Sequence, residues 1–203
     1  MKIQNLYPGG HASNCYLLTE GETAVVIDCT ASPQLIGDKL RESGASLAAI
    51  LLTHGHYDHL ITADAVKKQF HVPVYLHEGD ADFPTTGLLN CYHVFFGREA
   101  TFPPADRLFG NGDTLRFGSL EIGVTGTPGH TPGSCVLRAG NALFTGDTLM
   151  ACGYGRTTFP GGNTAAMRAS LESLAMFPGD LIIYPGHGEH TLLEIALDRI
   201  FGS

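Results

Sequence analysis

The sequence predicts a single α/β (α+β) domain in which two mixed β-sheets pack face to face and helices cover their outer faces. Three observations predict this fold. Strand-like runs and helical segments follow one another in the order strands, helix, strands, helix, twice along the chain. The clusters of polar residues follow the ends of strand-like runs, where rigid strands hold functional loops. The 203 residues are 43% hydrophobic and contain no repeat or linker, so we expect one domain over residues 1–203.

The first half of the chain contains the first set of elements. Residues 33–43 favour a helix, because Pro33 suits its first turn and Gly44 its end. Residues 62–70 predict a second helix. Short runs rich in apolar residues predict strands at residues 3–7, 15–19, 23–28, 48–52 and 73–76.

The second half repeats this order after an irregular segment. Residues 82–106 have little periodicity and several Pro and Gly residues, so we expect a long loop that lines a substrate site. A helix is predicted at residues 164–177, and a final helix from about residue 191. Strands are predicted at residues 114–117, 121–125, 134–138, 142–145 and 181–184.

The composition excludes two classes of partner. The formal net charge is -8 and Lys and Arg do not cluster, which argues against a nucleic-acid ligand. The N-terminus has no apolar leader, and no run approaches the roughly 20 apolar residues of a membrane span. We therefore expect a cytoplasmic protein that acts on neither nucleic acid nor membrane.

The cysteines indicate neither disulfides nor a thiolate metal site. They are odd in number, scattered and without CxxC spacing. Because free cysteine is among the most buried residue types, we expect buried thiols at Cys15, Cys29, Cys91, Cys135 and Cys152.

A cluster of metal-ligand residues follows the predicted strand at residues 48–52. His54, His56, Asp58 and His59 lie within six positions, where a turning backbone can direct them to one point. Imidazole nitrogen and carboxylate oxygen suit zinc, iron or manganese. This spacing is a strong indication of a metal site.

Three later residues add ligands of the same types at the ends of other predicted strands. These are His130, Asp147 and His187, each preceded by a glycine that lets the backbone turn. Seven ligands are too many for one tetrahedral ion, but they suit two ions that share a carboxylate. The alternative, hydrogen-bonded polar loop residues, does not account for this recurrence. Among the other histidines, His11 and His190 lie nearest these loops.

These seven residues resemble the metal motif of the metallo-β-lactamase superfamily, and the resemblance covers nearly the whole chain. It implies the αββα sandwich fold and two divalent metal ions per chain, zinc first, with iron or manganese also accepted. It further implies that Asp147 bridges the two metals together with a hydroxide that attacks the substrate. The implied ligands are His54, His56 and His130 for the first metal, and Asp58, His59 and His187 for the second.

Two aspartates have a second interpretation. Asp58 is also a candidate catalytic residue, because hydrolysis needs a group that holds or receives a proton, although a ligand role alone accounts for its presence. Asp28 ends the strand at residues 23–28. It is either a plain turn cap or a carboxylate outside the ligand set that orients a ligand, as the resemblance implies.

More narrowly, three segments resemble the small glyoxalase II-like (hydroxyacylglutathione hydrolase-like) proteins, which hydrolyse thioesters such as S-lactoylglutathione. They are Asn14-Cys15-Tyr16-Leu17, Pro128-Gly129-His130-Thr131-Pro132-Gly133 and the run from Gly155 to Gly162. Asp147 at the shared position disfavours a β-lactamase in this comparison. Arg156 would contact an anionic substrate. Because the chain ends soon after His187, we expect it to lack the C-terminal helical domain that binds glutathione in larger glyoxalase II enzymes.

Other functions remain open alongside a thioesterase that acts on a small-molecule substrate. His54, His130 and Asp147 also form a two-histidine, one-carboxylate set that suits a single iron, as in a persulfide dioxygenase-like oxidoreductase. A lactone or ester hydrolase of the same fold is a further alternative, and a non-enzymatic metal-bound sensor a third. The sequence is compatible with a monomer or a homodimer.

Overall fold

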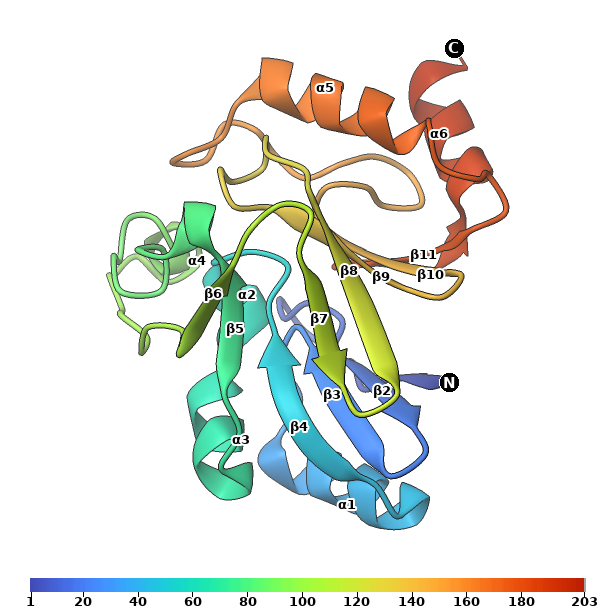
Figure 1. The fold of residues 1–203 in the computed structure, drawn as a ribbon. Helices are drawn as coiled ribbons and strands as arrows, with labels where there is room; N and C mark the ends of the chain where they lie inside the picture. Colours follow the sequence, from blue (N-terminus) through green and yellow to red (C-terminus); the bar gives the residue numbers. More distant parts are fainter. Residues whose placement is uncertain (203) are drawn as a thin grey trace.

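The computed structural model describes residues 1–202. Two six-stranded mixed sheets face each other, and helices cover the outer face of each sheet, so that four layers are stacked (Figure 1). The predicted fold class is confirmed.

The first sheet comes from the first half of the chain, in the spatial order β1-β2-β3-β4-β5-β6. Strands β3 to β6 run parallel, so their carboxyl ends lie at one edge. Its strands are β1 (Lys2–Asn5), β2 (Tyr16–Glu20), β3 (Thr23–Ile27), β4 (Ser46–Leu51), β5 (Val74–His77) and β6 (Arg107–Phe109). Helices α1 (Pro33–Ser43) and α3 (Ala63–Phe70) lie against its outer face (Figure 1).

The second sheet comes from the second half of the chain, in the order β12-β11-β10-β9-β8-β7. Its strands are β7 (Thr114–Phe117), β8 (Leu120–Gly126), β9 (Cys135–Ala139), β10 (Ala142–Gly146), β11 (Ile182–Pro185) and β12 (Thr191–Leu192). Helices α5 (Thr164–Leu174) and α6 (Leu193–Phe201) cover its outer face, on the side opposite α1 and α3 (Figure 1).

Strand alternation separates the buried residues into three apolar layers. In β3, Val25 and Ile27 point between the two sheets, whereas Ala24 and Val26 point toward α1 and α3. In the second sheet, Leu137 faces the other sheet and Val136 faces α5 and α6. Both faces of each central strand are therefore buried, which explains why these strands are almost continuously apolar.

Several elements differ from the sequence-based expectation. A short helix, α2 (Tyr57–Leu60), occupies part of the polar cluster, and a 3-10 turn, η1 (Glu78–Asp80), follows β5. The segment at residues 82–106 is not a continuous loop, because α4 (Tyr92–Phe96) lies within it. Strands β6 and β12 were not expected, and α5 ends before residue 177. The unexpected elements, namely α2, η1, α4, β6 and β12, are short and depend on contacts with distant residues.

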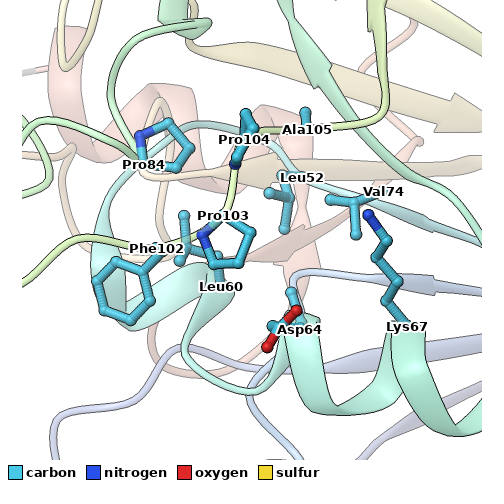
Figure 2. Close-up of a pocket in the computed structure, with 11 residues that line it drawn as sticks. Leu52, Leu60, Asp64, Lys67, Val74, Pro84, Phe102, Pro103, Pro104 and Ala105 are labelled. Atoms are coloured by element: carbon cyan, nitrogen blue, oxygen red, sulfur yellow. The ribbon is translucent and has the colours of Figure 1, made fainter.

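The part of residues 82–106 that follows α4 packs on the first sheet. Figure 2 shows Pro84 and the run from Phe102 to Ala105 over Leu52, Leu60 and Val74. The amide of Phe102 donates to the carbonyl of Pro84 at 2.8 Å, and the amide of Asp106 donates to Val74 at 2.8 Å. The proline-rich run thus closes the first apolar layer, whereas Phe83 and the region around α4 lie beside the polar edge.

The cysteines follow the expectation with one exception. Cys15, Cys29, Cys91 and Cys135 are buried free thiols, whereas Cys152 is exposed. In residues 1–202, no helix has the length and apolar character needed to cross a membrane.

Candidate metal centre

The seven predicted ligands lie on segments that follow four strands of the two sheets. The loop after β4 carries His54 and His56, and the short helix α2 that follows it carries Asp58 and His59. His130 follows β8, Asp147 follows β10, and His187 follows β11. The ends of these strands meet at one edge of the sandwich, so residues as far apart in sequence as His54 and His187 come together there.

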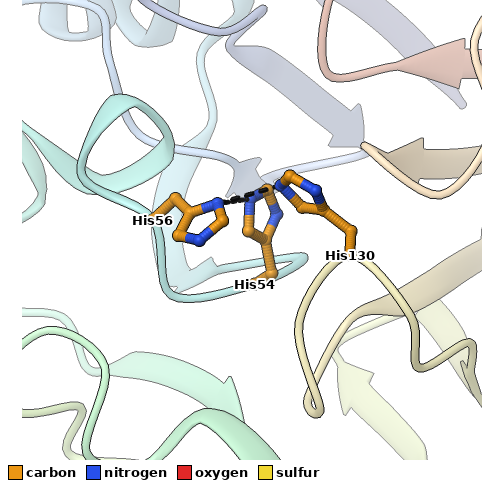
Figure 3. Close-up of side chains that lie close together, drawn as sticks. All are labelled: His54, His56 and His130. Atoms are coloured by element: carbon orange, nitrogen blue, oxygen red, sulfur yellow. Dashed lines mark hydrogen bonds between the residues drawn. The ribbon is translucent and has the colours of Figure 1, made fainter. Parts of the chain in front are cut away.

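Three imidazoles from two loops converge at the first point. His56 Nδ1 lies 3.1 Å from His54 Nε2 and 2.9 Å from His130 Nε2 (Figure 3). All three side chains are buried. Three ring nitrogens that face one another so closely are the arrangement expected of shared metal ligands.

Two carboxylates and two more imidazoles lie beside this trio. His187 Nε2 is 3.3 Å from Asp58 Oδ2, and His59 Nε2 is 3.4 Å from Asp147 Oδ1. Asp147 Oδ2 is 3.5 Å from His130 Nε2, so its two oxygens reach toward both groups of histidines. Asp58, His59 and His187 form one possible metal-holding group, and His54, His59 and Asp147 form another.

Two buried atoms of this centre have no hydrogen-bond partner in the described structure, namely His59 Nε2 and Asp147 Oδ1. Leaving a buried polar atom without a partner is costly, and such atoms are uncommon in folded proteins. Both atoms belong to residue types that bind metals, and they lie 3.4 Å apart. The donor set and these unsatisfied atoms therefore fit a metal at this position.

The electrostatic environment keeps four of the ligand residues free of protons, whereas the pKa of His59 is raised because Asp28 and Asp147 outweigh its burial. Burial lowers the pKa of His54 well below its usual value and the pKa of His56 to about 3, helped in both cases by neighbouring imidazoles. These rings are therefore neutral at neutral pH and keep a lone pair for a metal. Burial raises the pKa of Asp58 and of Asp147, but neighbouring histidines outweigh it and lower both, so both carboxylates stay ionised.

Asp28 lies behind His59, on the side away from the other ligands. It is buried, and its Oδ2 is 2.8 Å from His59 Nδ1. The backbone amide of Thr53 donates to Asp28 Oδ1 at 2.9 Å, and the Thr53 hydroxyl donates to both oxygens. Asp28 thus contacts both the turn after β4 and one imidazole, so it combines the two interpretations left open by the sequence.

The outer nitrogens of two other histidines also have partners. His130 Nδ1 donates to the carbonyl of Arg156 at 2.7 Å, and His56 Nε2 lies 3.4 Å from Cys91 Sγ. The carbonyl of Arg156 can only accept, so it fixes the orientation of the His130 ring and leaves the inner nitrogen Nε2 as the acceptor. The contact of Cys91 was not expected, because its sequence position in an irregular segment gives no signal for it.

Asp80 is a second residue that sequence reasoning missed. It is fully buried in η1 and accepts three hydrogen bonds. The amide of Gly133 donates to its Oδ1 at 2.6 Å, while the amide of Gly55 and the hydroxyl of Thr131 donate to its Oδ2 at 2.9 and 2.7 Å. One carboxylate therefore ties the loop of His54 and His56 to the loop of His130.

Close packing behind the ligands accounts for one of the glycines next to them. A Cβ at Gly186 would collide with Asp147 Oδ1 and would lie 2.6 Å from His59 Cε1. Only glycine lets the loop after β11 pass this close to the other ligand loops.

A cleft of about 510 Å³ opens over this centre. His56, Asp58, His130, Asp147 and His187 form its floor, while Arg156 lies at its wall with its guanidinium 5.7 Å from the ring centroid of Phe159. His11 also lines the cleft, whereas His190 stacks on Tyr184 at a ring distance of 5.6 Å. The metal-ligand residues are therefore open to a small molecule from one side.

Comparisons with known proteins agree with this arrangement. A family model described as the metallo-beta-lactamase superfamily matches residues 8–187, a range that includes all seven predicted ligands. Among curated proteins, "Probable metallo-hydrolase YqgX" of Bacillus subtilis is 32% identical over 194 residues, which cover 94% of this chain and 92% of the relative.

Two solved structures are similar over almost the full length. The crystal structure of BLEG-1 B3 metallo-beta-lactamase has a TM-score of 0.89 and 32% identity, with 97% of each chain covered. The crystal structure of TTHA1623 in a di-iron-bound form has a TM-score of 0.81 and 30% identity, with 96% of each chain covered. The similarity thus extends over both sheets and the loops at their shared edge.

Proposed function

This chain belongs to the metallo-beta-lactamase superfamily, and on that premise we propose that it is a metal-dependent hydrolase of small thioesters. The observation that carries the proposal is the convergence of seven histidine and aspartate side chains, five of which line one open cleft. The name of the Bacillus subtilis relative, a probable metallo-hydrolase, supports the reaction class.

We assign two divalent metals to the centre. His54, His56 and His130 would hold the first, Asp58, His59 and His187 the second, and Asp147 would reach both. Zinc is the first expectation for imidazole and carboxylate ligands, and iron is the second because a di-iron form of one similar structure is known. When bound, two such cations would lower the pKa of a water molecule and polarise a carbonyl.

The residues of the chain would do the remaining work. Asp28 would hold His59 in the orientation that leaves Nε2 free, and Asp58 would hold a proton at its carboxylate during the reaction. In the overall reaction, a C–O bond forms between water and the acyl carbon, the C–S bond breaks, and a proton of the water ends on the thiol. Arg156 would contact an anionic group of the substrate at the wall of the cleft.

The test is a measurement of metal content and thioesterase activity on the same preparation purified without chelator. We expect two metals per chain and turnover of S-lactoylglutathione, the substrate that the glyoxalase II-like motifs imply. Asp147→Asn should reduce both, because one carboxylate reaches both groups of histidines. Fully metallated protein that hydrolyses no thioester would overturn the proposal.

A second candidate is β-lactam hydrolysis. It is favoured by the similarity to BLEG-1, described as a B3 metallo-beta-lactamase, at a TM-score of 0.89. A chromogenic cephalosporin assayed beside the thioester distinguishes the two. Preference for the cephalosporin by a factor of about ten or more in kcat/KM would favour the lactamase function.

A further inference from the structure

Large apolar side chains lie exposed beside the polar centre. Val94, Phe95 and Tyr154 are 45%, 46% and 44% exposed, and all three line the cleft together with Met150. Scattered exposed apolar residues are common, but a group of them at the wall of one cleft marks a ligand-binding surface. The apolar group therefore needs an explanation in terms of the substrate.

Helix α4, which carries Val94 and Phe95, is fixed to the loop that carries His56 and Asp58. The amide of Tyr57 donates to the carbonyl of Asn90 at 2.9 Å. The ring of Tyr57 lies 5.4 Å from that of Phe95 and 5.6 Å from that of Phe96. Because Tyr57 sits between His56 and Asp58 in sequence, the position of α4 is set relative to the proposed metal ligands.

The ring of Phe95 has a second neighbour. The ring of His11 lies 5.8 Å from that of Phe95, so the loop before β2 contacts the same helix. Phe95 therefore contacts both Tyr57 and His11 and is still 46% exposed at the cleft. A substrate group that enters the cleft meets an apolar surface that is already in place, which reduces the ordering cost of binding.

The charge of the cleft restricts the substrate further. Among the lining residues in the described part of the chain, Arg156 is the one Arg or Lys. Glutathione carries two carboxylates, and each needs a cationic or hydrogen-bonding partner to offset its loss of water. One guanidinium at the wall suits a substrate with a single anionic group or none.

We propose that Val94, Phe95, Met150 and Tyr154 form the subsite for an apolar acyl group, so that the preferred substrates are thioesters of aliphatic or aromatic acids with at most one anionic group. This rests on the proposed thioesterase function and narrows it. Burial of a larger apolar acyl group against these side chains gives a larger gain in binding free energy.

The experiment compares acyl groups on one uncharged thiol. We would measure kcat/KM for the acetyl, butyryl, hexanoyl and phenylacetyl thioesters of N-acetylcysteamine, with S-lactoylglutathione as the comparison whose thiol part carries two carboxylates. We expect kcat/KM to rise about tenfold or more from acetyl to phenylacetyl, since each added buried carbon contributes to transition-state binding. If kcat/KM stays constant across the acyl groups, or is clearly highest for S-lactoylglutathione, the proposed subsite is wrong.

Two neighbouring phenylalanines give a matched pair of variants. Phe95 and Phe96 are 46% and 47% exposed, and both contact Tyr57, but Phe96 is not among the lining residues of the cleft in the described structure. Phe95→Ala should lower kcat/KM for the phenylacetyl thioester about tenfold, and by a clearly larger factor than for the acetyl thioester. Phe96→Ala should change neither. Equal losses in both variants would mean that α4 has only a structural role.

A binding measurement separates failure of the subsite from failure of the proposed reaction. The thioether analogue S-phenethyl-N-acetylcysteamine cannot be hydrolysed, and its binding to metallated protein can be followed by calorimetry. Binding that Phe95→Ala weakens and Phe96→Ala does not, without hydrolysis of any thioester, would retain the subsite and overturn the thioesterase function. Hydrolysis of the thioesters without such binding of the analogue would retain the thioesterase function and overturn the subsite.

Discussion

At the scale of single residues, Asp28 decides which nitrogen of His59 carries a proton. Its carboxylate accepts from His59 Nδ1, so Nε2 points toward Asp58 and Asp147. The backbone of Asp28 has a φ of 54°, in the left-handed region that Asp and Asn tolerate better than most residues. An Asn at this position therefore leaves the backbone undisturbed and changes only the side-chain chemistry.

We predict that Asp28→Asn weakens metal binding at the group formed by Asp58, His59 and His187. The new amide would donate to His59 Nδ1, which places the ring proton on Nε2, where a metal ligand needs a lone pair. Loss of such an outer partner costs about 10–100-fold in metal affinity. Competition with a chromophoric chelator measures the affinity of each metal. If both metals bind equally more weakly in the variant, the assignment of His59 to the group with Asp58 and His187 is contradicted.

Asp80 gives a second prediction at this scale. Asn has only one acceptor oxygen. In Asp80→Asn the new NH2 group would therefore face either the N–H of Gly133 or the two donors Gly55 and Thr131. A buried donor left without an acceptor costs about 1–3 kcal/mol of unfolding free energy. Because the three donors belong to the loops of His54, His56 and His130, binding of one metal should weaken as well.

Asp106→Asn is the control for Asp80→Asn. Asp106 also accepts from a backbone amide, that of Val74 at 2.9 Å, and pairs with Lys67, but it contacts none of the ligand loops. We expect this control to leave metal content unchanged when metal per chain is measured after dialysis. Equal loss of metal in both variants would show that Asp80 acts only through general stability.

The sequence alone indicates some of the residues at the site, but it gives no signal for others. The seven predicted ligands stand out because histidine and aspartate recur next to glycine at strand ends. Asp80 gives no such signal, since two of its partners are backbone amides more than 20 positions away, at Gly55 and Gly133. Phe95 is hidden for a similar reason, because only the folded chain shows which of two adjacent phenylalanines faces the cleft.

At the scale of elements, α5 supports the loop that carries His130. The amide of Asn163 donates to the carbonyl of Gly129 at 2.8 Å, and the hydroxyl of Ser170 donates to Pro128 at 2.7 Å. A Cβ at Gly129 would collide with the backbone of Met167 in α5. Helix and loop are thus in direct backbone contact.

We predict that Gly129→Ala lowers the free energy of unfolding by about 1–3 kcal/mol from overpacking, in addition to the strain of its positive φ. Gly140→Ala is the control, because Gly140 also has a positive φ but has open space around its Cα. Urea unfolding compares the two variants. A loss at Gly140 as large as the loss at Gly129 would attribute the effect to backbone strain alone.

Sequence periodicity predicts most of the elements, because both sheets and the four outer helices follow simple apolar patterns. Helix α4 is not predicted by sequence periodicity. It has five residues between Cys91 and Gly97, both in the left-handed conformation, and its rings pack on Tyr57. Strand β12 has two residues and exists through its pairing with β11. Long-range contacts, which no local pattern contains, stabilise both.

At the scale of the whole molecule, the two halves of the chain contribute to one centre. The first sheet carries His54, His56, Asp58 and His59, whereas the second carries His130, Asp147 and His187. Each of the three possible metal-holding groups in the described residues combines ligands of the first half with one ligand of the second half, which is His130, Asp147 or His187. A bound metal would therefore link the two sheets.

We predict that chelation destabilises the protein as a whole. A metal that binds only the folded chain adds about 4 kcal/mol when its free concentration is about 1,000 times its Kd. Removal of metal by a chelator should therefore lower the Tm, and added zinc should restore it. A Tm that the chelator leaves unchanged while metal content falls would show that the two sheets are held together by their apolar interface alone.

The distribution of the ligands along the chain has a consequence for synthesis. His54, His56, Asp58 and His59 are made early, but His187 follows more than 120 residues later, after β11. During translation, the nascent chain carries four exposed ligands before the remaining three exist. The proposed second metal position, formed by Asp58, His59 and His187, is incomplete until His187 has left the ribosome, so loading of both metals would follow the synthesis of β11.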